Sequence, residues 1–162
     1  MKGTYTILLG FGRAVSVRVG KLGRFRLSDG HYLYTGSALG KGAVSLEGRI
    51  SRHARRSKTL RWHIDYLTSS KYCKVGGVAY VISSRRFECK MNELIIRSIP
   101  AVPAISNFGS SDCDCFSHLL RPPSSLSLEQ VLVELRELYS KFGTPLVRRV
   151  GVIRYPELLP IS

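Results

Sequence analysis

The stretch HYLYTG, residues 31–36, and the following SALGKG, residues 37–42, decide how this chain folds. The first six residues are rich in aromatic side chains and predict a strand. The next six contain two glycines and predict a turn. A basic helix is expected after the turn, and its Arg49 and His53, four residues apart, share one face. A phenol from Tyr34, a guanidinium and an imidazole are therefore expected to meet, and phosphate chemistry can use all three.

The helix expected over residues 43–56 sorts its side chains into two arcs. One arc is an apolar stripe made of Ala43, Leu46, Ile50 and Ala54. The adjoining arc carries Arg49, Arg52, His53 and Arg56. Arg49 and His53 should therefore flank the core-facing stripe instead of pointing straight into water. A catalytic pair would need that placement.

The residues before this stretch predict further β structure. Residues 3–9 are rich in β-formers, and residues 10–13 indicate a turn. Residues 14–19 alternate apolar valines with polar side chains, which predicts a half-buried strand. We therefore expect a β-hairpin over the first twenty residues, with residues 24–27 as a short edge segment.

Two more helices are expected downstream, on either side of a strand at residues 75–82. The first, residues 59–69, has an apolar stripe of Leu60, His63, Ile64 and Leu67. A histidine on such a stripe is more often a hydrogen-bonded core residue than a ligand. The second, residues 88–99, places Glu88 on the inward side with Met91, Asn92, Ile95 and Ile99. The positive end of a helix can hold that carboxylate, but a buried one also needs a cation or hydrogen-bond donors.

The C-terminal part predicts an extension of the main domain. We expect a domain over residues 1–121, a Pro/Ser-rich linker at 122–126 and a helix-strand extension at 127–162. Ser127 and Gln130 form a capping box that opens a helix to about residue 142, and a strand-like run follows at 146–155. The apolar face of this helix either covers the sheet or forms a dimer or partner contact.

The charge of +14 is concentrated in one half of the chain. Residues 1–75 contain 15 Lys and Arg against three acids, whereas residues 76–162 contain 10 against eight. A basic face can simply keep a protein soluble. Because this excess coincides with the candidate site, we favour a nucleic-acid partner. With no apolar run of membrane-spanning length and no recognisable signal peptide, we expect a cytoplasmic protein.

Four cysteines, Cys73, Cys89, Cys113 and Cys115, are expected to be reduced thiols or metal ligands. Cys113 and Cys115 form a C-x-C-x2-H pattern with His118, and Cys89 could complete a zinc site. The pattern is not a standard C-x2-C knuckle. The alternative is a structural loop in which the cysteines pack as small apolar groups.

Several fragments in the right order resemble the GIY-YIG nuclease superfamily. They are Gly3-Thr4-Tyr5, then Tyr34-Thr35-Gly36, a helix with Arg49 and His53, and Glu88 opening a later helix. Further fragments resemble an uncharacterised branch of that superfamily, which occurs alone or joined to endonuclease III-like repair glycosylases. These are Tyr34-Thr35-Gly36-Ser37-Ala38, Arg52-His53, Arg61-Trp62-His63-Ile64-Asp65, Glu88-Cys89 and Gly109-Ser110-Ser111-Asp112-Cys113 with Ser117-His118.

The resemblance implies an α+β fold with a small three-stranded antiparallel sheet flanked by helices. It implies a catalytic group of Tyr5, Tyr34, Arg49, His53 and Glu88. Glu88 matches the carboxylate that binds one divalent ion, magnesium or manganese. Arg49 matches the arginine that contacts the scissile phosphate, and one of the two tyrosines is the base that activates water.

Other residues are expected around this group. The basic residues expected to contact nucleic acid are Lys41, Arg52, Arg55, Arg56, Lys58 and Arg61. Supporting roles are expected for His63, Asp65, Asn92, Asn107, Asp112 and His118. The asparagine that often completes the superfamily's site has two competing matches here, Asn92 and Asn107. The turn after Gly36 is also longer and richer in glycine than in many relatives.

The leading hypothesis is a metal-dependent endonuclease that cuts branched, nicked or single-stranded DNA in repair or recombination. A nucleic-acid-binding module without cleavage is the main alternative, and a zinc-stabilised interaction protein is a third.

Overall fold

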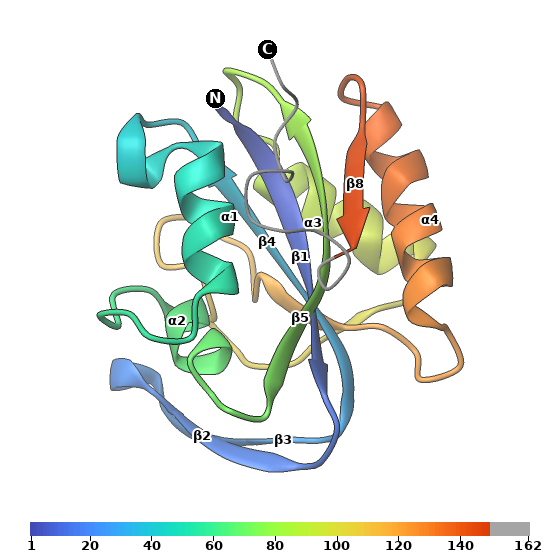
Figure 1. Cartoon of the computed structure of the whole chain (residues 1–162). Helices are drawn as coiled ribbons and strands as arrows, with labels where there is room; N and C mark the ends of the chain where they lie inside the picture. The colour runs from blue at the N-terminus through green and yellow to red at the C-terminus, as the bar shows by residue number, and fades with distance from the viewer. Residues whose placement is uncertain (150–162) are drawn as a thin grey trace.

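A six-stranded antiparallel sheet forms the centre of the protein, as the computed structural model of residues 1–149 shows (Figure 1). Its strand order is β6-β7-β4-β1-β5-β8. The strands are β1 (Gly3–Phe11), β4 (Gly30–Ala38), β5 (Cys73–Ile82), β6 (Val102–Pro103), β7 (Leu119–Arg121) and β8 (Leu146–Arg149). A separate two-stranded sheet contains β2 (Val15–Val19) and β3 (Gly23–Leu27). The α+β class is therefore confirmed.

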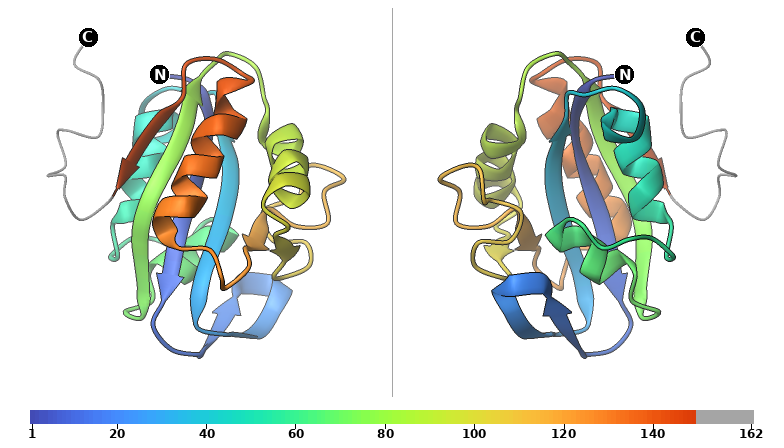
Figure 2. Two further views of the ribbon diagram at one scale, coloured as in Figure 1. Left: turned by 90° about the vertical axis from the view of Figure 1, so that its right-hand side faces the viewer. Right: turned by 90° about the vertical axis from the view of Figure 1, so that its left-hand side faces the viewer.

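Two pairs of helices cover the two faces of the large sheet (Figure 2). The front face, as we name it, carries α1 (Leu46–Ala54) and α2 (His63–Thr68). The back face carries α3 (Glu88–Ser98) and α4 (Leu128–Ser140). Strand β1 is central, so its side chains are buried on both faces: Tyr5 and Ile7 point into the front core and Leu8 into the back core. Such a strand has a continuous apolar run instead of an alternating one.

The expected sheet of three strands is wrong in its extent, because six strands are paired. The three central strands, β4, β1 and β5, coincide with the runs that predicted strands. Strands β6 and β7 have only two and three residues, which is too short for any periodicity to be detected. Strand β8 extends the sheet at the β5 edge.

The expected N-terminal hairpin is also wrong. Both strands exist, but β1 pairs with β4 and β5, whereas β2 pairs with β3. Strand β1 continues to Phe11, two residues into the expected turn at 10–13, because Phe11 still faces the front core, and the chain bends only at residues 12 and 13. The half-buried alternation of β2 fits its place in a small outer sheet that packs on α2.

Two helices begin later than their apolar patterns predicted. Helix α1 starts at Leu46, because the Ser45 hydroxyl accepts a hydrogen bond from the Gly48 N–H and caps it. Helix α2 starts at His63, because the Asp65 carboxylate accepts hydrogen bonds from the backbone N–H groups of Arg61 and Trp62. Ala43 and Leu60 are consequently outside the two helices and exposed, and Ala54, the last residue of α1, is exposed as well, so both apolar stripes are shorter than expected.

The C-terminal helix belongs to the same layered structure. The capping box of Ser127 and Gln130 is confirmed, and the apolar side of α4 covers the back face of the sheet. Tyr139 reaches the central strand, where its hydroxyl lies 2.8 Å from Thr6 Oγ1. The strand expected at 146–155 starts at Leu146 as predicted, and its residues from 150 on lie outside the described part. Within residues 1–149, no helix combines the length and apolar character that crossing a membrane requires.

Candidate functional site

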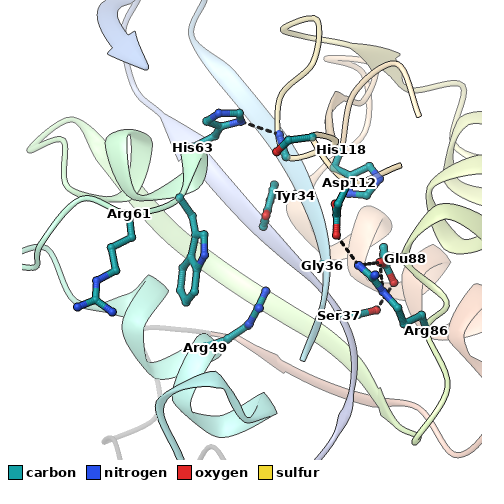
Figure 3. A pocket seen from close by; sticks show the side chains of 13 residues that line it. Tyr34, Gly36, Ser37, Arg49, Arg61, His63, Arg86, Glu88, Asp112 and His118 are labelled. Carbon is teal, nitrogen blue, oxygen red and sulfur yellow. Dashed lines mark hydrogen bonds and ion pairs between the residues drawn. The ribbon is translucent and has the colours of Figure 1, made fainter. Parts of the chain in front are cut away.

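A pocket of about 300 Å³ opens at the front face, between α1 and the start of α3 (Figure 3). One wall carries Arg49, Arg61 and Trp62, and the opposite wall carries Glu88 and Arg86. The remaining lining residues are Tyr34, Gly36, Ser37, His63, Gly109, Ser111, Asp112 and His118. The structure thus brings together seven residues expected at or around the site from distant parts of the sequence, namely Tyr34, Arg49, Arg61, His63, Glu88, Asp112 and His118.

The cationic wall is held in place by an aromatic ring. The Arg49 guanidinium carbon lies 4.7 Å from the centre of the Trp62 ring, and that of Arg52 lies 4.9 Å away. Such stacking fixes a planar cation while leaving its N–H edges available. The buried Arg49 Nε has no hydrogen-bond partner among the described residues. Arg49 therefore has one N–H group that no described protein group accepts.

Strand β4 lines the floor of the pocket, and the neighbouring strand β1 supplies Tyr5 beside it. Tyr5 is fully buried, and its hydroxyl lies 2.9 Å from His53 Nε2, which is also buried. Tyr34 lies beside them and is the tyrosine that lines the pocket. A side chain at Gly36 would place its Cβ 2.8 Å from the Tyr5 hydroxyl. The glycine of the Tyr34-Thr35-Gly36 motif is thus needed for this close approach.

Burial controls the ionisation of these groups. It raises the pKa of Tyr5 to about 12, although the neighbouring Arg49 acts to lower it. It also raises the pKa of Tyr34 well above the usual tyrosine value. Burial, with a smaller contribution from Lys58, lowers the pKa of His53 to about 3. At neutral pH both phenols are protonated and the His53 imidazole is neutral.

The acidic wall begins at the first residue of α3. The buried Glu88 carboxylate accepts a hydrogen bond from the Ser37 hydroxyl at one oxygen. Its other oxygen, Oε1, lies 2.6 Å from Arg86 Nη2. The same Arg86 nitrogen lies 2.9 Å from Asp112 Oδ2. Arg86 therefore joins two carboxylates at the edge of the pocket, and it satisfies the need for a cation beside Glu88.

His63 lies at the far end of the pocket and takes part in a defined hydrogen bond. Its Nδ1 is 3.0 Å from the Gly109 backbone nitrogen, which donates to it (Figure 3). A neutral imidazole that accepts at Nδ1 carries its proton at Nε2. Gly109 has a φ of +71°, and a Cβ there would lie 2.8 Å from Tyr34. His63 is therefore hydrogen-bonded, as expected for a histidine on a helix stripe, but it is only half-buried and lines the pocket, so it is not a core residue.

Other residues expected at the site hold the front helices together instead. Arg52 Nη2 lies 2.8 Å from Asp65 Oδ2, and Asp65 is fully buried. Burial acts to raise the pKa of Asp65, but Arg52 and two backbone N–H groups outweigh it, so the pKa lies below its usual value. Lys58 Nζ donates to the Arg52 carbonyl at 2.8 Å and to Thr68 Oγ1 at 2.6 Å. These side chains lock α1 onto α2.

The structure places five other expected residues outside the pocket lining, namely Asn92, Asn107, Lys41, Arg55 and Arg56. Asn92 is buried on α3 and donates to the Ser117 carbonyl at 2.8 Å, while Asn107 is exposed in a turn with a φ of 60°. Of the basic residues, Arg61 lines the pocket, and Lys41, Arg55 and Arg56 are exposed. An adjoining hollow shares Arg61 and His63 with the pocket and adds Arg18 and Lys21. Cationic side chains thus continue beyond the pocket towards β2.

Sequence reasoning missed three contributors to the pocket. Arg86 precedes a helix and shows no pattern that would distinguish it from a solvated cation. Ser37 and Trp62 stand inside the motifs quoted above, but nothing in the sequence indicates that one contacts Glu88 and the other stacks on Arg49. Their roles depend on contacts between separate elements, which local spacing does not encode.

A second polar cluster lies beside the acidic wall. The ligand atoms of Cys89, Cys113, Cys115 and His118 all lie within 4.8 Å of one another, and the four cysteines of the chain are free thiols. These four side chains could hold a metal ion. His118 lines the pocket as well, so the two sites share a wall.

The fold and the pocket define an α+β protein whose antiparallel sheet carries one cationic and one acidic wall at its front face. The chain belongs to the family described as "Domain of unknown function DUF123", whose model matches residues 4–141. Comparison with curated proteins and with solved structures found no match.

Proposed function

We propose that this protein is a GIY-YIG-type endonuclease that hydrolyses phosphodiester bonds in DNA. One observation carries the proposal: Tyr34, Arg49 and Glu88 line a single pocket although they come from β4, α1 and α3. These are the groups that the resemblance to GIY-YIG nucleases assigns to a base, a phosphate contact and a metal ligand. A catalytic site is expected where titratable and charged groups of different function converge in a hollow.

Arg49 is the proposed phosphate contact. Phosphodiester hydrolysis builds negative charge on the phosphoryl oxygens, and a fixed guanidinium stabilises that charge. Arg49 is fixed by Trp62 and has a buried Nε without a partner in the described chain. Its position at the pocket wall therefore suits an oxyanion ligand.

Glu88 is the proposed ligand of one Mg²⁺ or Mn²⁺ ion. These ions prefer oxygen donors and use one or two carboxylates together with water and substrate phosphates. The pocket offers a fitting set: the Glu88 carboxylate, the Ser37 hydroxyl and, across Arg86, the Asp112 carboxylate. When bound, such an ion supplies charge stabilisation at the phosphoryl oxygens and favours deprotonation of a water.

Tyr34 is the better candidate for the group that takes the proton from water. It lines the pocket, whereas Tyr5 is fully buried and hydrogen-bonded to His53. Because burial raises the pKa of Tyr34, its phenolate needs nearby positive charge, and Arg49 already acts to lower that pKa. The Tyr5–His53 pair does not take the proton in this proposal, and it serves to hold the floor of the pocket in place.

DNA is the proposed partner because cationic side chains extend from the pocket into the neighbouring hollow. Arg61 lies in both, with Arg18 and Lys21 further along. A polyanion longer than one phosphate could follow these residues, and its affinity would decrease steeply with salt. The preference for branched, nicked or single-stranded DNA, and a role in repair or recombination, belong to the same proposal.

The alternative function is a module that binds nucleic acid without cutting it. The contacts of Glu88 favour this alternative, since both carboxylate oxygens already have partners in Ser37 and Arg86. If Arg86 keeps its place, a divalent ion has to compete with a guanidinium for Glu88. The basic surface would then remain while hydrolysis is lost.

A cleavage assay with a matched pair of variants separates the two functions. Branched, nicked and single-stranded DNA, with RNA of the same sequences, are incubated with magnesium or manganese. We expect Glu88→Gln to lose about 10²-fold or more of the cleavage rate. Glu93→Gln, which alters an exposed carboxylate on the same helix, should retain it. DNA binding by wild type without any cleavage, under both metals, would instead establish the binding module.

A further inference from the structure

The cluster of Cys89, Cys113, Cys115 and His118 has the geometry of a coordination site. Cys113 Sγ lies 3.4 Å from His118 Nε2, and Cys89 Sγ lies 3.9 Å from the same nitrogen. All four ligand atoms lie within 4.8 Å of one another. Around a tetrahedral zinc ion, bond lengths of 2.0 to 2.3 Å put neighbouring ligand atoms roughly 3.5 to 3.8 Å apart. The observed separations therefore need little adjustment to surround one ion.

The donor set selects the kind of metal. Three thiolates and one imidazole suit zinc, whereas magnesium and manganese prefer oxygen. Four protein ligands fill a tetrahedral shell and leave no position for water or substrate, which distinguishes a structural site from a catalytic one. The cluster is therefore chemically distinct from the oxygen donors around Glu88.

His118 is held in a fixed position beside the cysteines. Its ring is buried, with Nε2 towards the sulfur atoms of Cys89 and Cys113. Its backbone is tied to two neighbouring segments, because the Thr35 N–H donates to the His118 carbonyl at 3.2 Å and the His118 N–H donates to the Phe108 carbonyl at 2.8 Å. The imidazole therefore approaches the sulfur atoms from an anchored part of the chain.

The surrounding chain is of the sort that a metal stabilises. Residues 104–118, between β6 and β7, form no helix or strand, and three of the four ligands are in or at the end of this loop. Loops of this length without regular structure are uncommon in small domains unless they are functional or anchored. The fourth ligand, Cys89, lies in the first turn of α3. One ion would join the loop to that helix.

We propose that these four residues bind one structural zinc ion, which ties the loop at 104–118 to the start of α3 and thereby fixes the acidic wall of the pocket. Cys89 directly follows Glu88, and Cys113 directly follows Asp112. Arg86 bridges those two carboxylates, so the zinc site and the Arg86 bridge join the same two segments. This inference does not depend on nuclease activity.

The metal content of the purified full chain tests the proposal directly. The protein is prepared under reducing conditions without chelator and dialysed, and its zinc content is measured by inductively coupled plasma mass spectrometry. We expect about one zinc per chain, as a closed structural site retains its metal. Cys113→Ser should lose most of it. Cys73→Ser, which changes a buried cysteine of β5 outside the cluster, should keep it.

Cobalt substitution gives a second measurement that needs no variant. Replacement of zinc by Co²⁺ in wild type should give the absorption of tetrahedral cobalt and thiolate-to-cobalt charge transfer. Zinc far below one equivalent together with no thiolate–cobalt band would overturn the proposal. An equal loss of zinc in Cys73→Ser and Cys113→Ser would do the same.

The zinc and nuclease proposals can fail separately. Glu88→Gln should keep its zinc while cleavage is lost. If zinc-loaded wild type cuts no DNA, the nuclease proposal is refuted and the zinc proposal is unaffected. If wild type cuts DNA but contains no zinc and gives no thiolate–cobalt absorption, only the zinc proposal is refuted.

Discussion

The two faces of the large sheet bury their side chains in different ways. The back core, under α3 and α4, is almost entirely aliphatic, with Tyr139 as its buried aromatic exception. The front core, under α1 and α2, contains several tyrosines and phenylalanines, and the buried His53 lies against Tyr5. Aliphatic packing is tolerant and stabilising, whereas buried phenols and imidazoles require matched partners. The back face thus supplies stability, and the front face holds polar groups in fixed positions.

The largest expected effect comes from breaking the back face. Leu135 is fully buried in the back core, and Leu135→Ala should lower the free energy of unfolding by about 2 to 5 kcal/mol. Urea unfolding measures this. Leu135 lies on α4, which contributes no residue to the pocket lining, so cleavage per folded molecule should be unchanged well below the melting temperature. A variant that stays folded but loses activity would show that the two faces are coupled.

Removal of Arg49 should instead lower the cleavage activity strongly and the stability only slightly. Arg49→Ala should lower kcat/KM for DNA cleavage by about 10²-fold, because it removes the cation expected to stabilise the transition state. Its stability should fall by only about 1 kcal/mol, the value of stacking on Trp62. Arg136→Ala, on the exposed side of α4, is the control and should change neither quantity. Equal activity of the two variants would contradict the role given to Arg49.

The pH dependence of stability isolates His53. Its pKa is about 3 in the folded protein and about 6.5 when unfolded, so below pH 6.5 the unfolded state binds a proton that the folded state does not. Stability should therefore fall with decreasing pH, by about 2 kcal/mol between pH 7 and pH 5. His53→Gln should show a correspondingly shallower decline in urea unfolding. The carboxylates whose pKa is lowered, Glu47, Asp65 and Asp112, titrate below this window. Burial also lowers the pKa values of His63 and His118, which act in the same direction in both proteins, so the difference between the two curves reports His53. Parallel curves for the two proteins would refute the buried neutral histidine.

The smallest expected effect comes from removing one helix cap on each face of the sheet. Ser45→Ala and Ser127→Ala should each lower stability by about 1 kcal/mol, because each hydroxyl accepts an N–H in the first turn of its helix. Only α1 carries Arg49, so only Ser45→Ala should also lower kcat/KM. A thermal melt with an activity assay on both variants measures this. Loss of activity in Ser127→Ala would mean that the back face influences the site.

The elements predicted best from the sequence are those whose signals are local. Helix α3 was expected at residues 88–99 and spans Glu88–Ser98, and the inward position of Glu88 is borne out. The capping box that begins α4 is likewise predicted directly from Ser127 and Gln130. The start of α2 was missed because Asp65 competes with the apolar pattern by accepting the backbone N–H groups of Arg61 and Trp62.

The parts of the site that could not be predicted depend on contacts between distant segments. The sequence shows Cys113, Cys115 and His118 close together and offers Cys89 as a possible fourth ligand, but only the structure shows that Cys89 lies beside them. Likewise, Arg86 acquires meaning only when Glu88 and Asp112 approach it from two sides. Charge shows the same limitation: Arg52 and Lys58 are expected from the sequence to contact nucleic acid, yet their side chains hold α1 and α2 together.

The two walls of the pocket come from different halves of the chain, and this sets an order of appearance during synthesis. Arg49, Arg61 and Trp62 leave the ribosome before Glu88 and long before His118. A growing polypeptide therefore displays its cationic surface while the acidic partner is still missing. It could adhere to a nearby nucleic acid at that stage, but the proposed hydrolysis would have to wait until translation had supplied the second half.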